Sequence, residues 1–265
     1  MLFFLCTAIL SYGLIVVGMT LYQDHLVFHN TRQTIFDHAP PVPFSVVSVT
    51  TTDGLTLNGY YAAPAPGKPV IVYFHGNAGY AGDRLYKTAE PLKEGYGFLL
   101  TEYRGYGGNP GAPSETGLYQ DARAWIAFLK HQNITDDQMI YYGESLGTGV
   151  AVQMAKDTPP RAVILEAPFT SVPDVGAFYY PFLPVRLVAK HHFDSRSKAS
   201  VLTMPVLIMH GTRDLTVPQR FGKQLFAAIP DGHKMFVSIP KAGHANVYDY
   251  GAAAIIMDFL HQHAP

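Results

Sequence analysis

Hydrophobic positions follow two different patterns along this chain of 265 residues. One continuous apolar run covers residues 1–23 and contains no formally charged side chain. After it, short apolar runs bounded by turn residues alternate with segments in which apolar residues recur every three or four positions. The first pattern is typical of a membrane-spanning helix, and the second indicates alternating strands and helices.

The run at residues 1–23 is long enough to cross a bilayer, because the hydrocarbon core requires about 20 apolar residues in a helix. It lacks the basic start and the small-residue cleavage site of a secretory signal. An uncleaved, single-pass N-terminal anchor is therefore favoured over a cleaved signal and over a buried core helix. The first Lys or Arg is Arg32, so flanking charge assigns no orientation. Residues 24–43, rich in His and Pro, are interpreted as a linker.

Eight strand-like runs follow in residues 44–265, which we interpret as one domain. The first two, Phe44–Thr50 and Leu55–Tyr61, flank Asp53-Gly54, a pair that favours an antiparallel hairpin. The other six are short and apolar, as expected of buried parallel strands, and cover 69–74, 97–103, 139–143, 162–166, 205–210 and 235–239. Helical patterns separate them. The alternation predicts an α/β fold with a mostly parallel central sheet flanked by helices.

Composition excludes several classes of protein. Charged residues make up 15% of the chain, and the 16 Phe and 17 Tyr exclude a disordered chain. A formal net charge of -1 gives no electrostatic footprint for nucleic acid, so no nucleic-acid partner is expected. The single cysteine, Cys6, excludes an intrachain disulfide and a cysteine-rich zinc module. Because H-E-x-x-H is also absent from the sequence, no metal is expected.

One serine, one aspartate and one histidine follow three different predicted strands. Ser145 occupies the centre of Gly-Glu-Ser-Leu-Gly, between a strand and a helical pattern, which fits the G-x-S-x-G turn. Asp214 ends the motif HGTRD, and His244 follows the last strand in AGH. Asp194 and Asp249 are rivals to Asp214, but neither follows a strand. Since parallel strands end at the same edge of a sheet, we expect the first three residues to form a Ser-His-Asp triad.

A fourth loop, the sequence HGNAG after the first buried strand, reaches the same edge. We expect the backbone N–H groups of Asn77 and Leu146 to form an oxyanion hole. The alternative is a glycine-rich turn without a ligand. His75 and His210, which begin two of these loops, are expected to brace the turns and not to bind a metal.

Together, HGNAG, GESLG, HGTRD and AGH resemble the α/β-hydrolase superfamily, which has the chain order Ser, Asp, His. The runs YRGYG at 103–107 and PSE at 113–115, with the N-terminal apolar segment, are similar to its membrane-anchored α/β-hydrolase-domain branch. Thr148 and Ala245 are mild departures from that branch. The resemblance covers most of the chain after the anchor. It implies a serine hydrolase of the α/β-hydrolase fold that acts through an acyl-enzyme and uses no cofactor.

An insert at about 168–204, rich in aromatic residues and proline, separates two predicted strands. We interpret it as a short lid over an acyl pocket, the alternative being ordinary packing of an extra helix. The candidate pocket residues are Phe169, Tyr179, Tyr180 and Phe182. With the anchor, this insert favours a lipid-like ester as substrate. The same chemistry serves thioesters and amides, so an acyl-protein thioesterase or a serine peptidase stays open, and a non-catalytic tethered interaction protein is less favoured.

Overall fold

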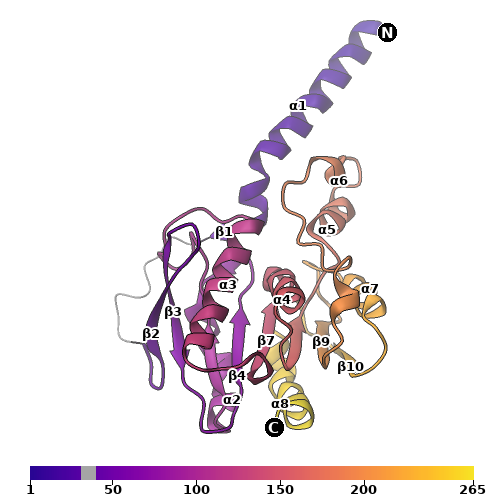
Figure 1. The fold of residues 1–265 in the computed structure, drawn as a ribbon. Coiled ribbons are helices and arrows are strands. Elements are labelled where there is room, and N and C mark those ends of the chain that lie inside the picture. The colour runs from indigo at the N-terminus through magenta and orange to yellow at the C-terminus, as the bar shows by residue number, and fades with distance from the viewer. Residues whose placement is uncertain (31–39) are drawn as a thin grey trace.

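A computed structural model describes residues 1–30 and 40–265 of the chain, and residues 31–39 of the expected linker lie outside the described residues. In Figure 1 an α/β body carries one long N-terminal helix that projects away from it. The body is built on an eight-stranded sheet with the order β10-β9-β8-β7-β4-β6-β3-β2. Its strands are β2 (Ser45–Thr50), β3 (Thr56–Ala62), β4 (Val70–Phe74), β6 (Gly97–Leu100), β7 (Met139–Glu144), β8 (Ala162–Glu166), β9 (Val206–Gly211) and β10 (Lys234–Ile239).

The pairing of the strands confirms the predicted sheet. From β10 to β6 all neighbours are parallel, whereas β6 pairs antiparallel with β3 and β3 pairs antiparallel with β2 at one edge. The β2–β3 register joins Thr50 to Thr56, so five residues form the turn that contains Asp53-Gly54. Strand β6 ends at Leu100, three residues earlier than predicted, because the chain leaves the sheet and Glu102 turns toward the HGNAG loop.

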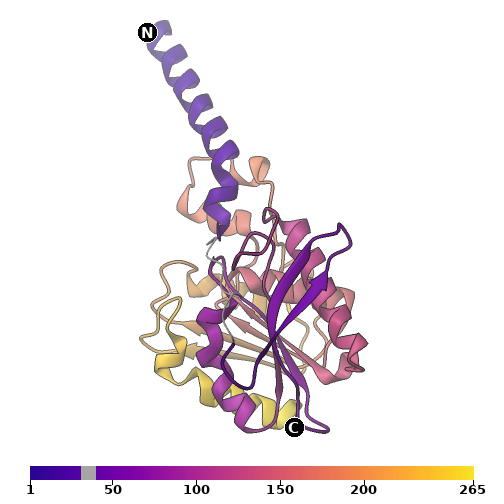
Figure 2. The same cartoon turned by 90° about the vertical axis from the view of Figure 1, so that its left-hand side faces the viewer.

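Helices cover both faces of the sheet, as Figures 1 and 2 show. The α-helices of the body are α2 (Ala89–Lys93), α3 (Glu115–His131), α4 (Leu146–Asp157), α5 (Val172–Tyr179), α6 (Val185–Val188), α7 (Gln219–Ala228) and α8 (Ala252–His263). The described residues also form four 3₁₀ segments, η1 (Ala81–Thr88), η2 (Asp136–Gln138), η3 (Ala199–Val201) and η4 (Val247–Tyr250). Helix α3 begins where predicted, since the Ser114 hydroxyl accepts the Gly117 N–H at 3.0 Å.

Two hydrophobic cores form because successive strand residues point to opposite faces. On β4, Val70, Val72 and Phe74 pack with α3, α4 and α7, whereas Ile71 and Tyr73 pack with η1 and α8. All five β4 side chains are buried. This two-sided burial explains why the central strands are uninterrupted apolar runs in the sequence, and it fixes the carboxyl ends of the strands at one edge.

The N-terminal helix α1 (Leu2–Val27) continues four residues beyond the apolar run into the expected linker. Its segment Phe3–Val27 is long and apolar enough to cross a membrane by length and composition. None of its described side chains is buried, which excludes the core-helix interpretation. After it, Phe28 is buried in the body, and β1 (His29–Asn30) pairs parallel with β5 (Ala78–Gly79) of the HGNAG loop. The helix is therefore joined directly to the edge of the sheet that carries the candidate site.

Candidate active site

Ser145 lies in a sharp turn between β7 and α4. Its backbone has φ 49° and ψ −116°, values that side-chain-bearing residues rarely adopt. Its N–H donates to the Glu166 carbonyl of the neighbouring strand at 2.9 Å. A Cβ at Gly147 would lie 2.0 Å from the Phe74 carbonyl oxygen, and one at Gly143 would lie 2.5 Å from the Gly147 carbonyl oxygen. The G-x-S-x-G spacing is thus required by close backbone approach, which leaves the serine side chain presented at the sheet edge.

Three loops bring together the three residues singled out in the sequence. His244 Nε2 lies 2.8 Å from Ser145 Oγ, and His244 Nδ1 lies 2.7 Å from Asp214 Oδ2. The second carboxylate oxygen of Asp214 accepts the N–H groups of Thr216 and Val217 at 2.9 and 2.8 Å. The Asp214 side chain is fully buried, whereas 20% of the His244 side chain is exposed. These hydrogen bonds orient a serine hydroxyl, an imidazole and a carboxylate in one line.

The surroundings of Asp214 keep its carboxylate ionised. Burial by itself opposes ionisation, but hydrogen bonds from His210, His244 and the Val217 N–H outweigh it and hold the pKa of Asp214 well below its ordinary 3.8. His210 is fully buried, with Nε2 2.7 Å from the Val217 carbonyl oxygen and 3.3 Å from Asp214 Oδ2. An ionised Asp214 favours the imidazole tautomer with Nδ1–H directed toward it. That tautomer leaves Nε2 able to accept the serine proton.

The rival aspartates have other surroundings. Asp194 accepts the Ser197 N–H at 3.0 Å and so closes a local turn, and Asp249 is exposed in η4. Within the described residues, no group of three or more His, Cys, Asp or Glu side chains is arranged to hold a metal ion.

A cavity of about 490 Å³ lies beside Ser145. Asn77 and Leu146, the predicted oxyanion donors, line it together with the serine. Leu146 is the first residue of α4, where N–H groups have no partner within the helix and the helix dipole favours negative charge. The two residues therefore border the space that a substrate carbonyl at Ser145 would occupy.

The aromatic insert supplies much of the cavity wall. Phe169, Tyr179 and Tyr180 line it, whereas Phe182 does not: its side chain is 64% exposed and its carbonyl accepts the Tyr12 hydroxyl at 2.8 Å. The prediction for Phe182 rested on composition, which cannot distinguish a residue that faces the cavity from one at the outer tip of the insert. Residues of α1 also line the cavity, a contribution that hydropathy along the sequence does not indicate.

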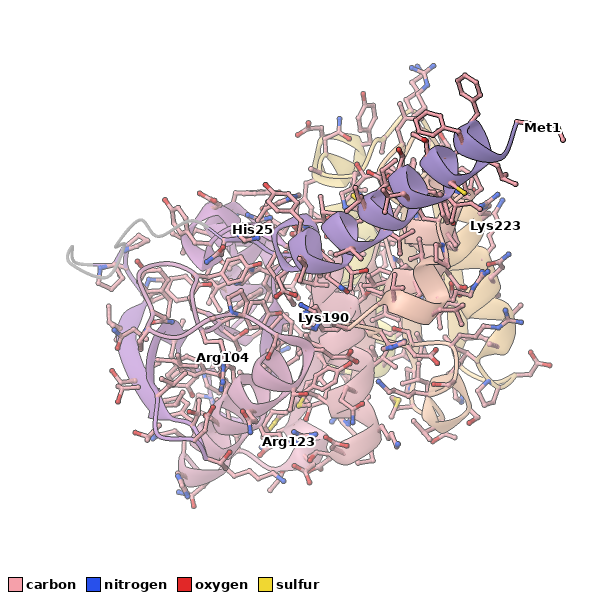
Figure 3. All side chains as sticks on the ribbon, turned by 90° about the horizontal axis from the view of Figure 1, so that it is seen from above. Met1, His25, Arg104, Arg123, Lys190 and Lys223 are labelled. Atoms are coloured by element: carbon pink, nitrogen blue, oxygen red, sulfur yellow. The ribbon has the colours of Figure 1, made fainter. Side chains whose placement is uncertain are left out.

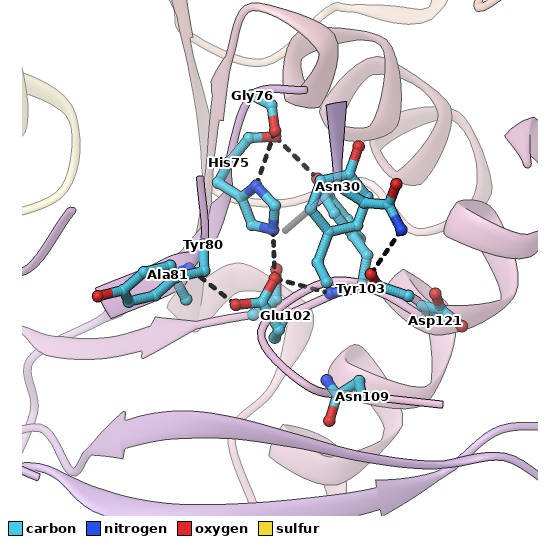
Figure 4. A network of polar contacts seen from close by, with 12 residues as sticks. Asn30, His75, Gly76, Tyr80, Ala81, Glu102, Tyr103, Asn109 and Asp121 are labelled. Atoms are coloured by element: carbon cyan, nitrogen blue, oxygen red, sulfur yellow. Dashed lines mark hydrogen bonds and ion pairs between the residues drawn. The ribbon is translucent and has the colours of Figure 1, made fainter. Parts of the chain in front are cut away.

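The HGNAG loop is braced from the sheet side, as Figure 4 shows. His75 Nε2 lies 2.6 Å from Glu102 Oε1, with both side chains fully buried, and His75 Nδ1 lies 2.7 Å from the Gly76 carbonyl oxygen. The other Glu102 oxygen accepts the Ala81 N–H at 2.8 Å, and the Tyr103 hydroxyl donates to the His75 carbonyl at 3.2 Å. His75 therefore holds the turn, as predicted, and connects it to the residues after β6.

A buried ionic cluster that was not predicted from the sequence lies next to the nucleophile turn. Lys87 Nζ lies 2.7 Å from Glu144 Oε2 and 2.7 Å from Glu166 Oε2, and Arg84 Nη2 lies 2.7 Å from Glu144 Oε1. The hydroxyls of Tyr73 and Tyr142 donate to Glu144 and Glu166 respectively. We name these six residues the ionic cluster. The sequence does contain a signal for this cluster, because two adjacent apolar strands each end in a glutamate and buried carboxylates require cationic partners.

Burial and ion pairing act in opposite directions within the ionic cluster. Burial alone would raise the pKa of Glu144, but Lys87 and Arg84 lower it well below the ordinary 4.5. Burial alone would lower the pKa of Lys87, but Glu166 and Glu144 raise it above the ordinary 10.5. Both groups are therefore charged at neutral pH. Two cations and two anions balance beneath the serine turn.

Comparisons with known proteins agree with this architecture. Residues 69–197 match the sequence profile of a family described as alpha/beta hydrolase fold. An uncharacterized protein of Mycobacterium tuberculosis strain H37Rv is 40% identical over 224 residues, covering 80% of this chain and 79% of that protein. The lysophosphatidylserine lipase ABHD12 of Danio rerio is 33% identical over 224 residues, covering 72% of this chain but 58% of that longer protein.

A solved structure has the same fold. The Pyrococcus furiosus esterase Pf2001 superimposes with a TM-score of 0.68, at 19% sequence identity, over 88% of this chain and 99% of that chain. At this identity the likeness concerns the fold of the body.

Proposed function

Because this chain belongs to the α/β-hydrolase superfamily, we propose that it is a membrane-anchored serine hydrolase that cleaves carboxylic esters of lipid-like acyl substrates. The observation that carries the proposal is the hydrogen-bonded line from Ser145 Oγ through His244 to Asp214, with distances of 2.8 and 2.7 Å. The cavity beside it supports an apolar substrate, and the similarity to ABHD12, a lysophosphatidylserine lipase, supports an ester of this class.

Each residue of that line has a distinct role in the proposed reaction. Ser145 Oγ attacks the acyl carbonyl carbon while His244 Nε2 accepts the serine proton. The N–H groups of Asn77 and Leu146 stabilise the oxyanion, and loss of one such donor typically costs ~10²–10³ in turnover. The bond to the alcohol breaks as His244 returns the proton to the leaving oxygen. Water then attacks the acyl-enzyme with His244 as base, and Ser145 regains its proton. Asp214 stabilises the imidazolium throughout.

The anchor places this chemistry at a membrane. Helix α1 passes the length and composition criteria for a membrane span, and it ends two residues before β1, which pairs with the HGNAG loop. A single-pass N-terminal anchor therefore holds the candidate site close to the bilayer, where lipid-like esters are concentrated.

The test is labelling of the full chain by a fluorophosphonate, with p-nitrophenyl butyrate turnover measured on the same samples. We expect wild type to be labelled and active. Ser145→Ala should lose the label and turnover by on the order of 10⁵–10⁶-fold. The control is Ser200→Ala, an exposed serine in η3, which should retain both. A folded wild type without label would contradict the proposal and favour the tethered interaction protein.

The acyl bond is then identified by a panel of long-chain esters, acyl thioesters and aminoacyl amides. We expect the highest kcat/KM for a long-chain ester. A higher value for the matched thioester would replace this proposal with a thioesterase, and a higher value for the amide would replace it with a peptidase.

A further inference from the structure

Helix α1 carries a stripe of half-buried residues on an otherwise exposed surface. Its members recur every three or four positions, which places them on one face of the helix, and they are Val16, Met19, Thr20, Gln23, Asp24 and Val27. Every other described side chain of the helix is exposed. We call these six residues the α1 stripe. A helix that served as a tether alone would have no reason to pack one face against the body.

All residues of the α1 stripe except Asp24 line the same cavity as the candidate nucleophile. Val16, Met19, Thr20 and Val27 line it from one side, and Ser145 lines it as well. The insert supplies the opposite side, through residues of α5 and α6 and the segment between them. The cavity therefore extends from the serine along the helix as far as Val16, inside the run that is apolar enough to cross a membrane.

Polar contacts fix the helix against the insert. Gln23 Oε1 accepts the Lys190 N–H at 2.7 Å, and Gln23 Nε2 donates to the Val188 carbonyl at 3.2 Å. Asp24 Oδ1 lies 2.9 Å from His191 Nε2. In the view from above in Figure 3, Lys190 lies beside the body end of α1, near His25. These contacts therefore fix the position of α1 relative to the insert on the other side of the cavity.

The insert reaches to the depth of the membrane-spanning run. The Tyr12 hydroxyl donates to the Phe182 carbonyl at 2.8 Å, so the tip of the insert stands level with the middle of α1, beside it in Figures 1 and 2. Ten residues, 2–11, precede Tyr12, which is about 15 Å of helix against a hydrocarbon core of about 30 Å. A bilayer that buries this run also contacts the tip. The exposed side chains of Phe182 and Leu187 suit that environment.

We propose that the α1 stripe is one wall of the acyl-chain site, so that the membrane anchor also selects the substrate. A single fatty acyl chain enters from the bilayer between α1 and the insert, and its carbonyl carbon comes to rest at Ser145. The chain's far end lies against Val16 and Met19. This inference rests on the proposed hydrolase function and assigns to α1 a specificity role beyond anchoring.

The experiment compares two tryptophan variants of the full chain in lipid nanodiscs. Val16→Trp fills the cavity from the α1 side, and Val17→Trp, on the next residue and 55% exposed, adds the same bulk toward the lipid. Labelling rates of Ser145 are measured with hexadecyl and butyl fluorophosphonates. We expect Val16→Trp to lower the hexadecyl-to-butyl ratio by about tenfold or more, since each displaced methylene weakens binding by about fourfold. Val17→Trp should keep the wild-type ratio.

Equal ratios in the two variants, whether unchanged or lowered, would overturn the inference, because the effect would not depend on the face of the helix. Val16→Ala provides a second test in case Val16→Trp does not fold. We expect Val16→Ala to raise the rate of labelling by an eicosyl fluorophosphonate relative to the hexadecyl probe. If wild type reacts with neither probe, the proposed function fails. Binding of a dansylated fatty acid then still tests the site, and equal affinities of Val16→Trp and Val17→Trp would contradict it.

Discussion

The two sides of Ser145 differ in the forces that shape them. On the sheet side, the turn is surrounded by backbone in close contact and by the ionic cluster, in which the side chains of Lys87 and Glu166 are 1% and 0% exposed. On the cavity side, a largely apolar cavity lies between α1 and the insert, which are joined by partly exposed hydrogen bonds. The difference separates two roles. In the proposed reaction, the sheet side fixes where the reacting atoms lie, and the cavity side selects the molecule that reaches them.

The largest effect is expected from removal of the charge on Asp214. Asp214→Asn keeps the size of the side chain, but its amide can donate to His244 Nδ1 and so favours the wrong imidazole tautomer. We expect turnover of p-nitrophenyl butyrate to fall by about 10⁴-fold with the fold intact. Asp249→Asn, on an exposed rival, should leave turnover unchanged. A loss below tenfold for Asp214→Asn would show that His244 does not depend on this carboxylate.

The ionic cluster is expected to give the next largest effect, on stability. Lys87→Met leaves Glu144 and Glu166 buried without their shared cation, which should lower the free energy of unfolding by about 3–5 kcal/mol. Lys93→Met removes the exposed pair of Lys93 with Glu90 and should cost at most about 1 kcal/mol. Urea unfolding at pH 7 measures both. If both variants lost the same free energy of unfolding, the buried ion pairs of the cluster would contribute no more to stability than the exposed pair.

Acid should weaken that same cluster. Because the folded-state pKa of Glu144 is depressed below 4.5, its ionised form contributes stability that is present above pH 4.5 and is lost as the pH falls toward the folded value. Lys87→Met removes the main cause of the depression. We therefore expect the stability difference between wild type and Lys87→Met to shrink from pH 7 to pH 4. A difference that stays constant over this range would show that Glu144 and Lys87 are not coupled.

The smallest effect is expected on the cavity side. Gln23→Ala removes hydrogen bonds to the backbone of Val188 and Lys190, each contributing about 0.5–1.5 kcal/mol. Hydrogen exchange of residues 185–191 should accelerate about fivefold, while that of β7 stays slow. Leu21→Ala, at a 72% exposed position of the same helix, is the control. Faster exchange throughout the body would indicate that the cavity side and the sheet side are one cooperative unit.

Much of the fold could be predicted from the sequence because the sheet is buried on both faces. Runs such as PVIVYF have no charged side chain to place in water, and their alternation with helical patterns indicates parallel strands. The early end of β6 could not be predicted in this way, since the residues after Leu100 remain buried. What removes them from the ladder is the contact of Glu102 with His75, made across 27 positions of sequence.

The sequence by itself determined the α/β class, the order of serine, aspartate and histidine after three strands, and a run long enough to cross a membrane. Each of these depends on local spacing and on the rule that parallel strands end at one edge. Only the tertiary structure decided what surrounds Ser145: the balance of charge in the ionic cluster, the place of Phe182 outside the cavity and the packing of α1 against the insert. Those features depend on contacts between distant segments, such as Gln23 with Lys190, which are set by how the elements pack in three dimensions.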